Sequence, residues 1–300
     1  MREVRDLHLS ALQLQRGHPL PSVRGTHPTP EGFLSSPTAM SSAIGRAAIA
    51  PALAAPSVRA EQVTQLVYGE TASIVERTGD WRRVHIHADG YYGWIHTGYL
   101  LEVDDRSAED WRARASGWSE GALVRVDEAN VPLPLRARVM LGAGAVVLPD
   151  GRQGRVSGGS IRQQSEIRAE ACTKAPERWA LEHFLGSPYL WGGVTPWGVD
   201  CSGLTQTTFA ARGISLPRDS GQQAACGENI PLEAARPGDL LFFRGESGKG
   251  ITHVAFAGEA DTLVHSTLSC GGMLLESWLP GTRAASLRER LVVVRRLEHR

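Results

Sequence analysis

A cysteine with polar neighbours and two histidines further along the chain could together break an amide bond. Cys201 lies in "WGVDCSGLT", between Asp200 and Ser202, whereas a structural cysteine usually has apolar neighbours. A thiol becomes a good nucleophile when a base takes its proton. His253, in "THVAFAG", could be that base, and His265, in "LVHST", could orient His253 by a hydrogen bond. The sequence therefore predicts a cysteine–histidine–histidine triad.

Local patterns predict the elements that must hold this triad in place. The stretch "CSGLTQTTFAARG" suits a helix that ends at Gly213. Cys201 would then lie in the first turn, where free N–H groups, the helix dipole and a neighbouring imidazolium lower the pKa of a thiol. His253 and His265 lie in strand-like segments joined by "GEADT", so adjacent antiparallel strands could place the imidazoles side by side. Helices followed by such strands predict an α+β domain at 166–300.

Two groups of short strand-like segments precede this domain. "TQLVYGETASIVERTGDWRRVHIHADGYYGWIHTGYL" alternates apolar and polar residues between turns, which predicts a small β-barrel at 47–104. Residues 117–162 repeat the pattern more weakly and predict a second, divergent barrel. Residues 1–46 are rich in Pro, Ser and Gly, so we expect disorder there or an overlong start. The tract "AIGRAAIAPALAAPS" could instead be the core of a secretory signal.

Composition limits the classes of function. The chain has 300 residues, of which 42% are hydrophobic and 21% charged, as in soluble proteins with two or three domains. Its 32 basic and 32 acidic residues give no net charge, so nothing favours nucleic acid as a partner. No apolar run approaches the roughly 20 residues that span a bilayer. Four cysteines are too few for a disulfide scaffold, so we expect a cytoplasmic monomer, with export as the alternative.

Two further histidines, His85 and His87 in "VHIHADG", could bind a metal from one face of a strand. No third ligand stands near them in the sequence, so a solvated strand face is the favoured interpretation. We therefore predict no metal and no cofactor.

The ordered motifs resemble the NlpC-type cell-wall cysteine peptidases, which have a papain-like α+β fold. The resemblance covers about 180–300 and rests on "GSPYLWGGVTPWGVDCSGLTQTTFAARGISLPRDSGQQ", "RPGDLLFF", "THVAFAG" and "LVHS". The upstream barrels resemble bacterial SH3 domains, so the chain from about 47 is similar to the γ-D-glutamyl-L-diamino acid endopeptidases of that family. Those enzymes cleave peptidoglycan stem peptides, and a subset requires a free N-terminal L-alanine. The resemblance implies a thioester acyl-enzyme, with Cys201 as nucleophile, His253 as base, His265 as third member and Tyr189 as an oxyanion or substrate contact.

Such a substrate would present an ammonium on its L-alanine and a free carboxylate on its D-glutamate. Asp200 and Asp219 are candidates for binding the ammonium, and Arg218, Ser202 and Ser220 for binding the carboxylate. The "PRDS" stretch could instead be a helix-capping turn.

The resemblance also implies that the first barrel closes the non-prime end of the cleft. Tyr91 and Glu70 would then lie near the substrate amine. In a strand, Tyr91 and Tyr92 point to opposite faces, so only one of them can reach the cleft. The same tyrosines could simply pack the barrel.

Other functions stay open alongside this one. The triad could act on a different amide, on intact peptidoglycan, or in acyl transfer. A wall-binding module with an inactive catalytic domain is a further alternative, although the order of Cys201, His253 and His265 argues against it. Either lysine or diaminopimelate could follow the cleaved bond.

Overall fold

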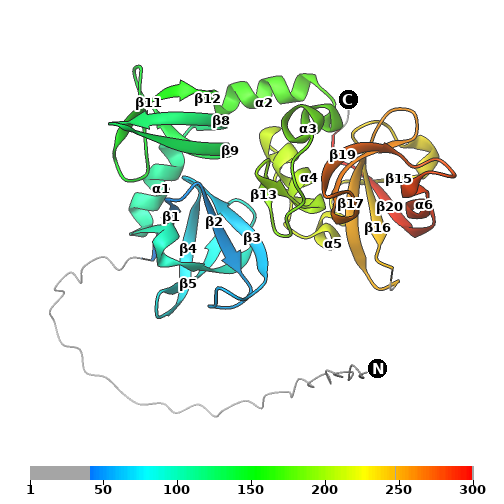
Figure 1. Ribbon diagram of the computed structural model, residues 1–300, viewed down its shortest axis with the longest axis horizontal. Coiled ribbons are helices and arrows are strands. Elements are labelled where there is room, and N and C mark those ends of the chain that lie inside the picture. Colours follow the sequence, from blue (N-terminus) through cyan, green and yellow to red (C-terminus); the bar gives the residue numbers. More distant parts are fainter. Residues whose placement is uncertain (1–40, 247, 299–300) are drawn as a thin grey trace, which may run out of the picture. The chain divides into compact units, whose positions relative to one another are not determined.

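Three main antiparallel sheets follow one another along residues 41–246 and 248–298, the part of the chain that the computed structural model describes (Figure 1). The first two sheets form two small β-domains, and the third belongs to an α+β domain with a helical layer. This architecture confirms the predicted fold class. No helix in these described residues is long and apolar enough to cross a bilayer.

The first β-domain, residues 42–103, has the strand order β3-β2-β6-β5-β4-β1-β7. Its strands are β1 (Ser42–Gly45), β2 (Ile49–Leu53), β3 (Gln62–Val67), β4 (Thr71–Thr78), β5 (Trp81–Ile86), β6 (Tyr92–His96) and β7 (Leu100–Val103). Its core is made largely of small and branched side chains.

Strand β1 corrects the expectation that 1–46 lacks structure. Residues 1–40 lie outside the described residues, but Ser42–Gly45 pairs with both β4 and β7. The sequence "SAIG" is too short and too rich in small residues to show a strand period, so only its pairing partners reveal it. The tract that could have been a signal core forms β1 and β2.

The second β-domain, residues 117–163, closes into a small barrel because β11 pairs with both β10 and β8. Its strands are β8 (Gly117–Val126), β9 (Ala129–Leu141), β10 (Val146–Val147), β11 (Gln153–Gly158) and β12 (Ile161–Gln163). Helix α1 (Asp105–Arg114) joins the two β-domains, and its buried Trp111 donates a hydrogen bond to the Gly69 carbonyl at 2.7 Å. The core of the second β-domain includes Val67 and Tyr68 from the first.

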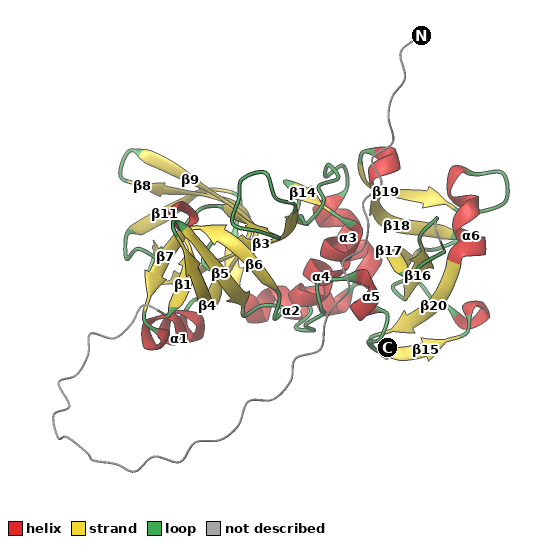
Figure 2. Cartoon of the chain, turned by 90° about the horizontal axis from the view of Figure 1, so that it is seen from below, coloured by secondary structure: helices red, strands yellow, loops and turns green. Residues whose placement is uncertain are grey.

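The α+β domain packs helices against a sheet of order β15-β20-β16-β17-β18-β19. The strands are β15 (Glu228–Ile230), β16 (Leu240–Arg244), β17 (Ile251–Ala257), β18 (Thr262–Thr267), β19 (Gly272–Ser277) and β20 (Leu291–Arg296). The helices are α2 (Gln164–Thr173), α3 (Pro176–Phe184), α4 (Cys201–Ala211), α5 (Ser220–Gln223) and α6 (Leu287–Arg290), and β13 (Val194–Thr195) and β14 (Gly198–Val199) form a small hairpin. Helices α3 and α4 lie against the sheet (Figure 2).

Helix α4 is buried almost throughout, from Cys201 to Phe209. It ends where predicted, because Gly213 adopts a φ of 78° that favours glycine. The helical pattern upstream is divided into α2 and α3, since Pro176 begins a new helix and disfavours helical backbone at the residue before it.

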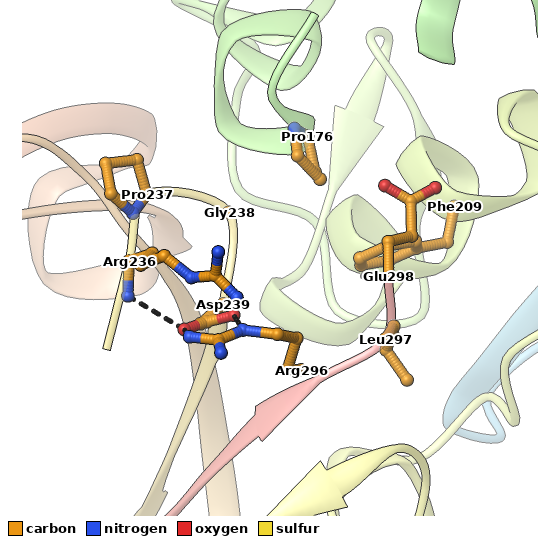
Figure 3. Close-up of a pocket in the computed structure, with 9 residues that line it drawn as sticks. All are labelled: Pro176, Phe209, Arg236, Pro237, Gly238, Asp239, Arg296, Leu297 and Glu298. Carbon is orange, nitrogen blue, oxygen red and sulfur yellow. Dashed lines mark hydrogen bonds and ion pairs between the residues drawn. The ribbon is translucent and has the colours of Figure 1, made fainter. Parts of the chain in front are cut away.

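An ion pair between Asp239 and Arg296 holds the "RPGD" turn before β16 (Figure 3). Asp239 accepts hydrogen bonds from the Arg236 backbone N–H at 2.8 Å and from Arg296 Nε at 2.9 Å, which joins the turn to β20. Gly238 has a φ of 92°, and a Cβ there would lie 2.6 Å from Pro176 Cδ. The small pocket in Figure 3, about 70 Å³, therefore borders a structural turn.

Candidate active site

The thiol of Cys201 lies at the first turn of α4. Asp200 caps this helix, because its Oδ1 accepts a hydrogen bond from the Gly203 N–H at 2.7 Å. A Cβ at Gly203 would lie 2.0 Å from the Gly193 carbonyl, so the "CSG" glycine lets the preceding loop pass close to the helix. The Cys201 side chain is 7% exposed, and the N–H groups of Ser202 and Val254 hydrogen-bond to its sulfur.

Strands β17, β18 and β19 carry a chain of hydrogen-bonded side chains beside this thiol. His253 Nε2 lies 2.8 Å from His265 Nδ1, so the two imidazoles are adjacent, as the sequence predicts. His265 Nε2 lies 2.7 Å from Glu276 Oε1 on β19. Arg283 completes the chain, since its Nε donates to Glu276 Oε2 at 3.1 Å.

One arrangement of protons satisfies this chain. Burial raises the pKa of Glu276, but the hydrogen bond from His265 and the charge of Arg283 outweigh it and hold this pKa below its usual value. The ionised Glu276 accepts a hydrogen bond from His265 Nε2–H, so His265 Nδ1 accepts a hydrogen bond from His253 Nε2–H. His253 Nδ1 then carries the lone pair that could take the thiol proton.

Sequence reasoning missed Glu276. An acidic residue in the strand after His265 is the only signal for it, because "GMLLES" gives no sign of its pairing register. In the structure Leu263 pairs with Glu276, and His265 pairs with Leu274, so the carboxylate lies diagonally across from the imidazole.

The surroundings of the thiol and of the base shift both pKa values toward the neutral forms. Burial and the charge of Asp200 raise the pKa of Cys201 to about 12. Burial, the neighbouring His265 and the charge of Arg290 lower the pKa of His253 to about 3. The N–H of Ser202 at the helix start does lower the pKa of the thiol, as expected, but burial and Asp200 outweigh it. The cap that starts the helix also places a carboxylate beside the sulfur.

We expect alkylation of Cys201 by iodoacetamide to accelerate steadily with pH. Because its pKa lies near 12, its thiolate fraction should rise about tenfold per pH unit between pH 7 and 10. The measurement is the labelling rate of the Cys201 peptide by mass spectrometry, with the exposed Cys270 as an internal control for the reagent. A rate at Cys201 that is already constant below pH 7 would instead indicate a thiolate–imidazolium pair.

Tyr189 lies near the thiol with its hydroxyl protonated. Burial, followed by the charges of Cys201 and Asp200, raises the pKa of Tyr189 to about 12. Its backbone is fixed by a hydrogen bond from its N–H to the Gly271 carbonyl at 2.8 Å. The phenol can therefore donate a hydrogen bond to a negative oxygen at neutral pH.

Three of the expected substrate-binding residues bind one another instead. Arg218 Nη2 lies 2.5 Å from Asp200 Oδ2, and Arg218 Nη1 donates to Ser202 Oγ at 2.8 Å. Arg218 Nε also reaches Thr64 Oγ1 on β3 at 3.1 Å, and the Gly192 N–H donates to Asp200 at 2.8 Å. Five donors in total reach the two Asp200 oxygens, so this buried pair joins the helix start, the preceding loop and the first β-domain.

A second pair leaves a carboxylate accessible. The Tyr91 hydroxyl donates to Asp219 Oδ2 at 3.1 Å, across from the first β-domain to the α+β domain. Asp219 is exposed and stands at the N-cap position of α5, yet its side chain caps no N–H there, while Ser220 is buried in the first turn. Of the two tyrosines Tyr91 therefore reaches Asp219, whereas Tyr92 is half exposed and stacks on His85 with ring centroids 4.6 Å apart.

Glu70, which the family resemblance placed near the substrate amine, has an internal partner in the structure. Its Oε1 accepts a hydrogen bond from Arg136 Nε at 2.6 Å, and both side chains are buried. Arg136, on β9, also donates to Thr207 Oγ1 on α4 at 3.1 Å. The "YGE" glutamate therefore pairs with a cation of the second β-domain that lies 66 residues further along the chain, and this cation in turn contacts the helix that carries the nucleophile.

We expect Glu70→Gln to destabilise the fold. Breaking one partner of a buried ion pair typically costs about 3–5 kcal/mol, so the free energy of unfolding in urea should fall by that order. Glu76→Gln is the matched control, since Glu76 faces Arg83 at 3.7 Å with both side chains about half exposed. A Glu70 variant of normal stability with a raised KM would instead place Glu70 at the substrate.

Strand β3 of the first β-domain borders the loop before Cys201. Gln62 Nε2 donates to the Trp191 carbonyl at 2.8 Å, and the Val194 N–H donates to Gln65 Oε1 at 3.1 Å. A Cβ at Gly192 would lie 2.9 Å from the Gln62 carbonyl, so this "GG" loop can lie close to β3. The contacts make the first β-domain one wall beside the thiol.

Of the two candidate metal histidines, His87 has hydrogen-bond partners at both of its ring nitrogens. His87 Nδ1 lies 2.8 Å from Thr71 Oγ1, and its Nε2 lies 2.8 Å from Ser73 Oγ. Both ring nitrogens are therefore occupied by hydroxyl groups of β4.

Two family models match the regions that build this site. A model of the NlpC/P60 family matches residues 186–280, which include Cys201, His253, His265 and Glu276. A model of the bacterial dipeptidyl-peptidase Sh3 domain matches residues 53–100, within the first β-domain.

Relatives match most of the chain. A γ-D-glutamyl-L-lysine dipeptidyl-peptidase of Bacillus cereus is 30% identical over 227 residues, which are 68% of this chain and 66% of that protein. A protein of the same name from Bacillus subtilis is 31% identical over 227 residues, 68% of this chain and 71% of that protein. Among solved structures, an NlpC/P60 family protein from Bacillus cereus superposes with a TM-score of 0.72 at 22% identity, over 86% of this chain and 99% of that one, which shows a shared fold.

Proposed function

This chain belongs to the NlpC/P60 family of cysteine peptidases, and on that premise we propose that it hydrolyses the γ-D-glutamyl-L-diamino acid bond of peptidoglycan stem peptides with a free N-terminal L-alanine. One observation carries the proposal. The Tyr91 hydroxyl of the first β-domain donates a hydrogen bond to an accessible carboxylate, Asp219. The α+β domain that carries Asp219 also carries the thiol and the two hydrogen-bonded imidazoles. A substrate with an amine at one end and an amide to be cleaved needs both groups.

The first half of the reaction forms a thioester. His253 Nδ1 takes the proton of Cys201 while the sulfur attacks the γ-carbonyl carbon of D-glutamate. His265 and Glu276 stabilise the resulting imidazolium through the two hydrogen bonds behind it. The Tyr189 hydroxyl donates to the negative oxygen of the tetrahedral intermediate.

The intermediate then collapses and is hydrolysed. The C–N bond breaks, and His253 gives its proton to the α-nitrogen of the diamino acid, which leaves as a free amine. Water attacks the thioester while His253 takes one of its protons, and the C–S bond breaks. The proton returns to Cys201, and L-Ala-D-Glu is released.

The amine end of the substrate is bound by charge. Burial and the neighbouring Asp219 raise the pKa of Tyr91 to about 12, so this tyrosine remains a neutral donor that positions the carboxylate. The exposed Asp219 carboxyl group is the partner for the L-alanine ammonium.

Blocking the amine tests the proposal. L-Ala-γ-D-Glu-L-Lys should be cut, and its N-acetylated form should have a kcat/KM lower by about tenfold or more, because acetylation removes the positive charge that pairs with Asp219. Products are identified by mass spectrometry. Asp219→Asn should narrow the difference between the two peptides, while Asp261→Asn, remote in sequence and paired with Arg288, should preserve it.

Equal kcat/KM values for the free and the acetylated peptide would contradict the proposal. They would indicate an open non-prime side and favour an endopeptidase that acts on intact peptidoglycan. Failure to cut either peptide would point to a different amide substrate.

A further inference from the structure

A cationic pocket of about 110 Å³ lies beside the two imidazoles. His253 and His265 line it together with Arg244, Arg283 and Arg290. Hydroxyl groups and short apolar side chains complete the lining, and no carboxylate is among the described residues that border it. The mechanism above uses the imidazoles and leaves this arginine-rich space without a role.

The three arginines of the pocket differ in the partners that their guanidinium groups already have. Arg283 is paired with Glu276, and an Arg244 amino group donates to the Glu289 carbonyl at 2.8 Å. Arg290 faces only a loose partner, because Glu246 lies 3.7 Å away and its side chain is 93% exposed. The Glu289 carbonyl carries no net charge, so the pocket retains positive charge from Arg244 as well as from Arg290.

Arg290 also carries an unused donor. Its Nε is buried and has no hydrogen-bond partner among residues 41–246 and 248–298. Buried donors are nearly always satisfied, so an orphaned guanidinium N–H next to a pocket indicates a missing acceptor. A guanidinium presents a planar fork of donors that matches a carboxylate. The volume exceeds the roughly 30 Å³ of one water molecule, so a carboxylate fits with room to spare.

The proposed reaction brings a carboxylate to this place. His253 must approach the α-nitrogen of the leaving diamino acid in order to protonate it. The α-carboxylate of that residue is only two bonds from the same nitrogen. A pocket that borders His253 can therefore receive this group, whereas the side chain of the diamino acid extends further away.

We propose that this pocket binds the free α-carboxylate of the leaving diamino acid, so that preferred substrates end at that residue. This inference rests on the proposed function and specifies its substrate class. A stem peptide extended by D-alanine has a neutral amide at the same position and loses the ion pair with Arg290. A carboxypeptidase-type hydrolysis that removes terminal D-alanine must then supply the tripeptide.

The charges also link this pocket to the base. Arg290 and Arg283 contribute to the lowered pKa of His253, after burial and His265. A carboxylate that neutralises Arg290 removes part of this effect and favours the imidazolium. Substrates with the free carboxylate should therefore have a higher kcat as well as a lower KM.

Matched peptides test the pocket. L-Ala-γ-D-Glu-L-Lys and its C-terminal amide differ only in the predicted contact, and the tetrapeptide ending in D-alanine moves the carboxylate one residue further along. The wild-type protein should cut the free acid with a kcat/KM about tenfold or more above the other two, as expected for a charge-assisted hydrogen bond. Arg290→Gln should bring the acid-to-amide ratio close to one.

Arg288→Gln is the control, because Arg288 also belongs to α6 but lies over the Trp278 ring and pairs with Asp261, outside this pocket. It should keep the wild-type ratio. Arg290→Lys retains the charge and should keep part of the preference for the free acid. If Arg290→Gln does not fold, the acid-to-amide ratio of kcat/KM can be measured on Arg290→Lys instead. Calorimetry with the acid and the amide on the Cys201→Ala protein measures the same preference without turnover.

The possible results separate the inference from the proposed function. Equal cleavage of acid and amide by the wild-type protein, or an unchanged ratio in Arg290→Gln, would overturn the pocket assignment and leave the proposed function intact. If no peptide is cut or bound, the proposed function fails and the pocket assignment falls with it.

Discussion

Replacing Cys201 by alanine is expected to abolish peptide hydrolysis while the protein stays folded. Loss of a covalent nucleophile removes the thioester route altogether, and rates should fall by about 10⁴-fold or more, to the background of the assay. The change removes one sulfur atom from a site that Asp200 and Gly203 already fix through backbone hydrogen bonds. The measurement is the release of L-Ala-D-Glu from the free tripeptide, together with a thermal melt of both proteins.

The other three cysteines provide matched controls. Cys172 and Cys270 are exposed, Cys226 is partly buried, and all are free thiols. Alanine at each of these positions should leave activity largely unchanged. Full activity in Cys201→Ala, or loss of activity in one of the controls, would contradict the proposed mechanism.

Local sequence signals were sufficient to predict the framework of the site. The helix that begins at Cys201 has a cap, a glycine near its start and a glycine after its end, and each acts within a few residues. The two imidazoles could be placed together because a short turn joins their strands. Adjacent antiparallel strands then bring His253 and His265 into contact.

The partners of the charged residues could not be predicted in the same way. Arg218 contacts Thr64, 154 residues earlier, and Arg136 contacts Glu70, 66 residues earlier. Sequence reasoning assigned Asp200 and Arg218 to the substrate because the expected substrate carries an ammonium and a carboxylate, and the family resemblance implied Glu70 near the amine. Which charges are neutralised internally depends on which surfaces meet after folding, and a single sequence does not encode those contacts locally.

These internal pairs explain how three domains can form one precise site. The ion pair of Asp200 and Arg218 reaches β3, and that of Glu70 and Arg136 reaches α4. All four side chains are buried, so moving a β-domain away from the α+β domain would break hydrogen bonds to buried guanidinium groups, at a cost of roughly 1–3 kcal/mol each. These bonds hold the β-domains beside the helix that carries the thiol.

The imidazole chain leads to the second large effect, a graded loss of activity along its length. His253→Ala should lower kcat by about 10²- to 10⁴-fold, because a missing general base removes proton transfer in both halves of the reaction. His265→Ala should cost less, since His253 keeps its lone pair but loses the hydrogen bond that orients it. Glu276→Gln should cost least, because an amide can still accept from His265 Nε2–H but no longer stabilises a positive charge.

The same series distinguishes proton transfer from simple packing. All three variants should change kcat more than KM, because proton transfer takes place in the chemical steps, whereas the arginines supply the charge that binds the carboxylate. His85→Ala, which changes a histidine of the first β-domain that stacks on Tyr92, is the control and should leave kcat unchanged. Equal and small losses in His253→Ala and His265→Ala would show that the base is misassigned. A larger loss in Glu276→Gln than in His265→Ala would reverse the proposed order, since the outermost group would then act on the thiol by a route other than the two imidazoles.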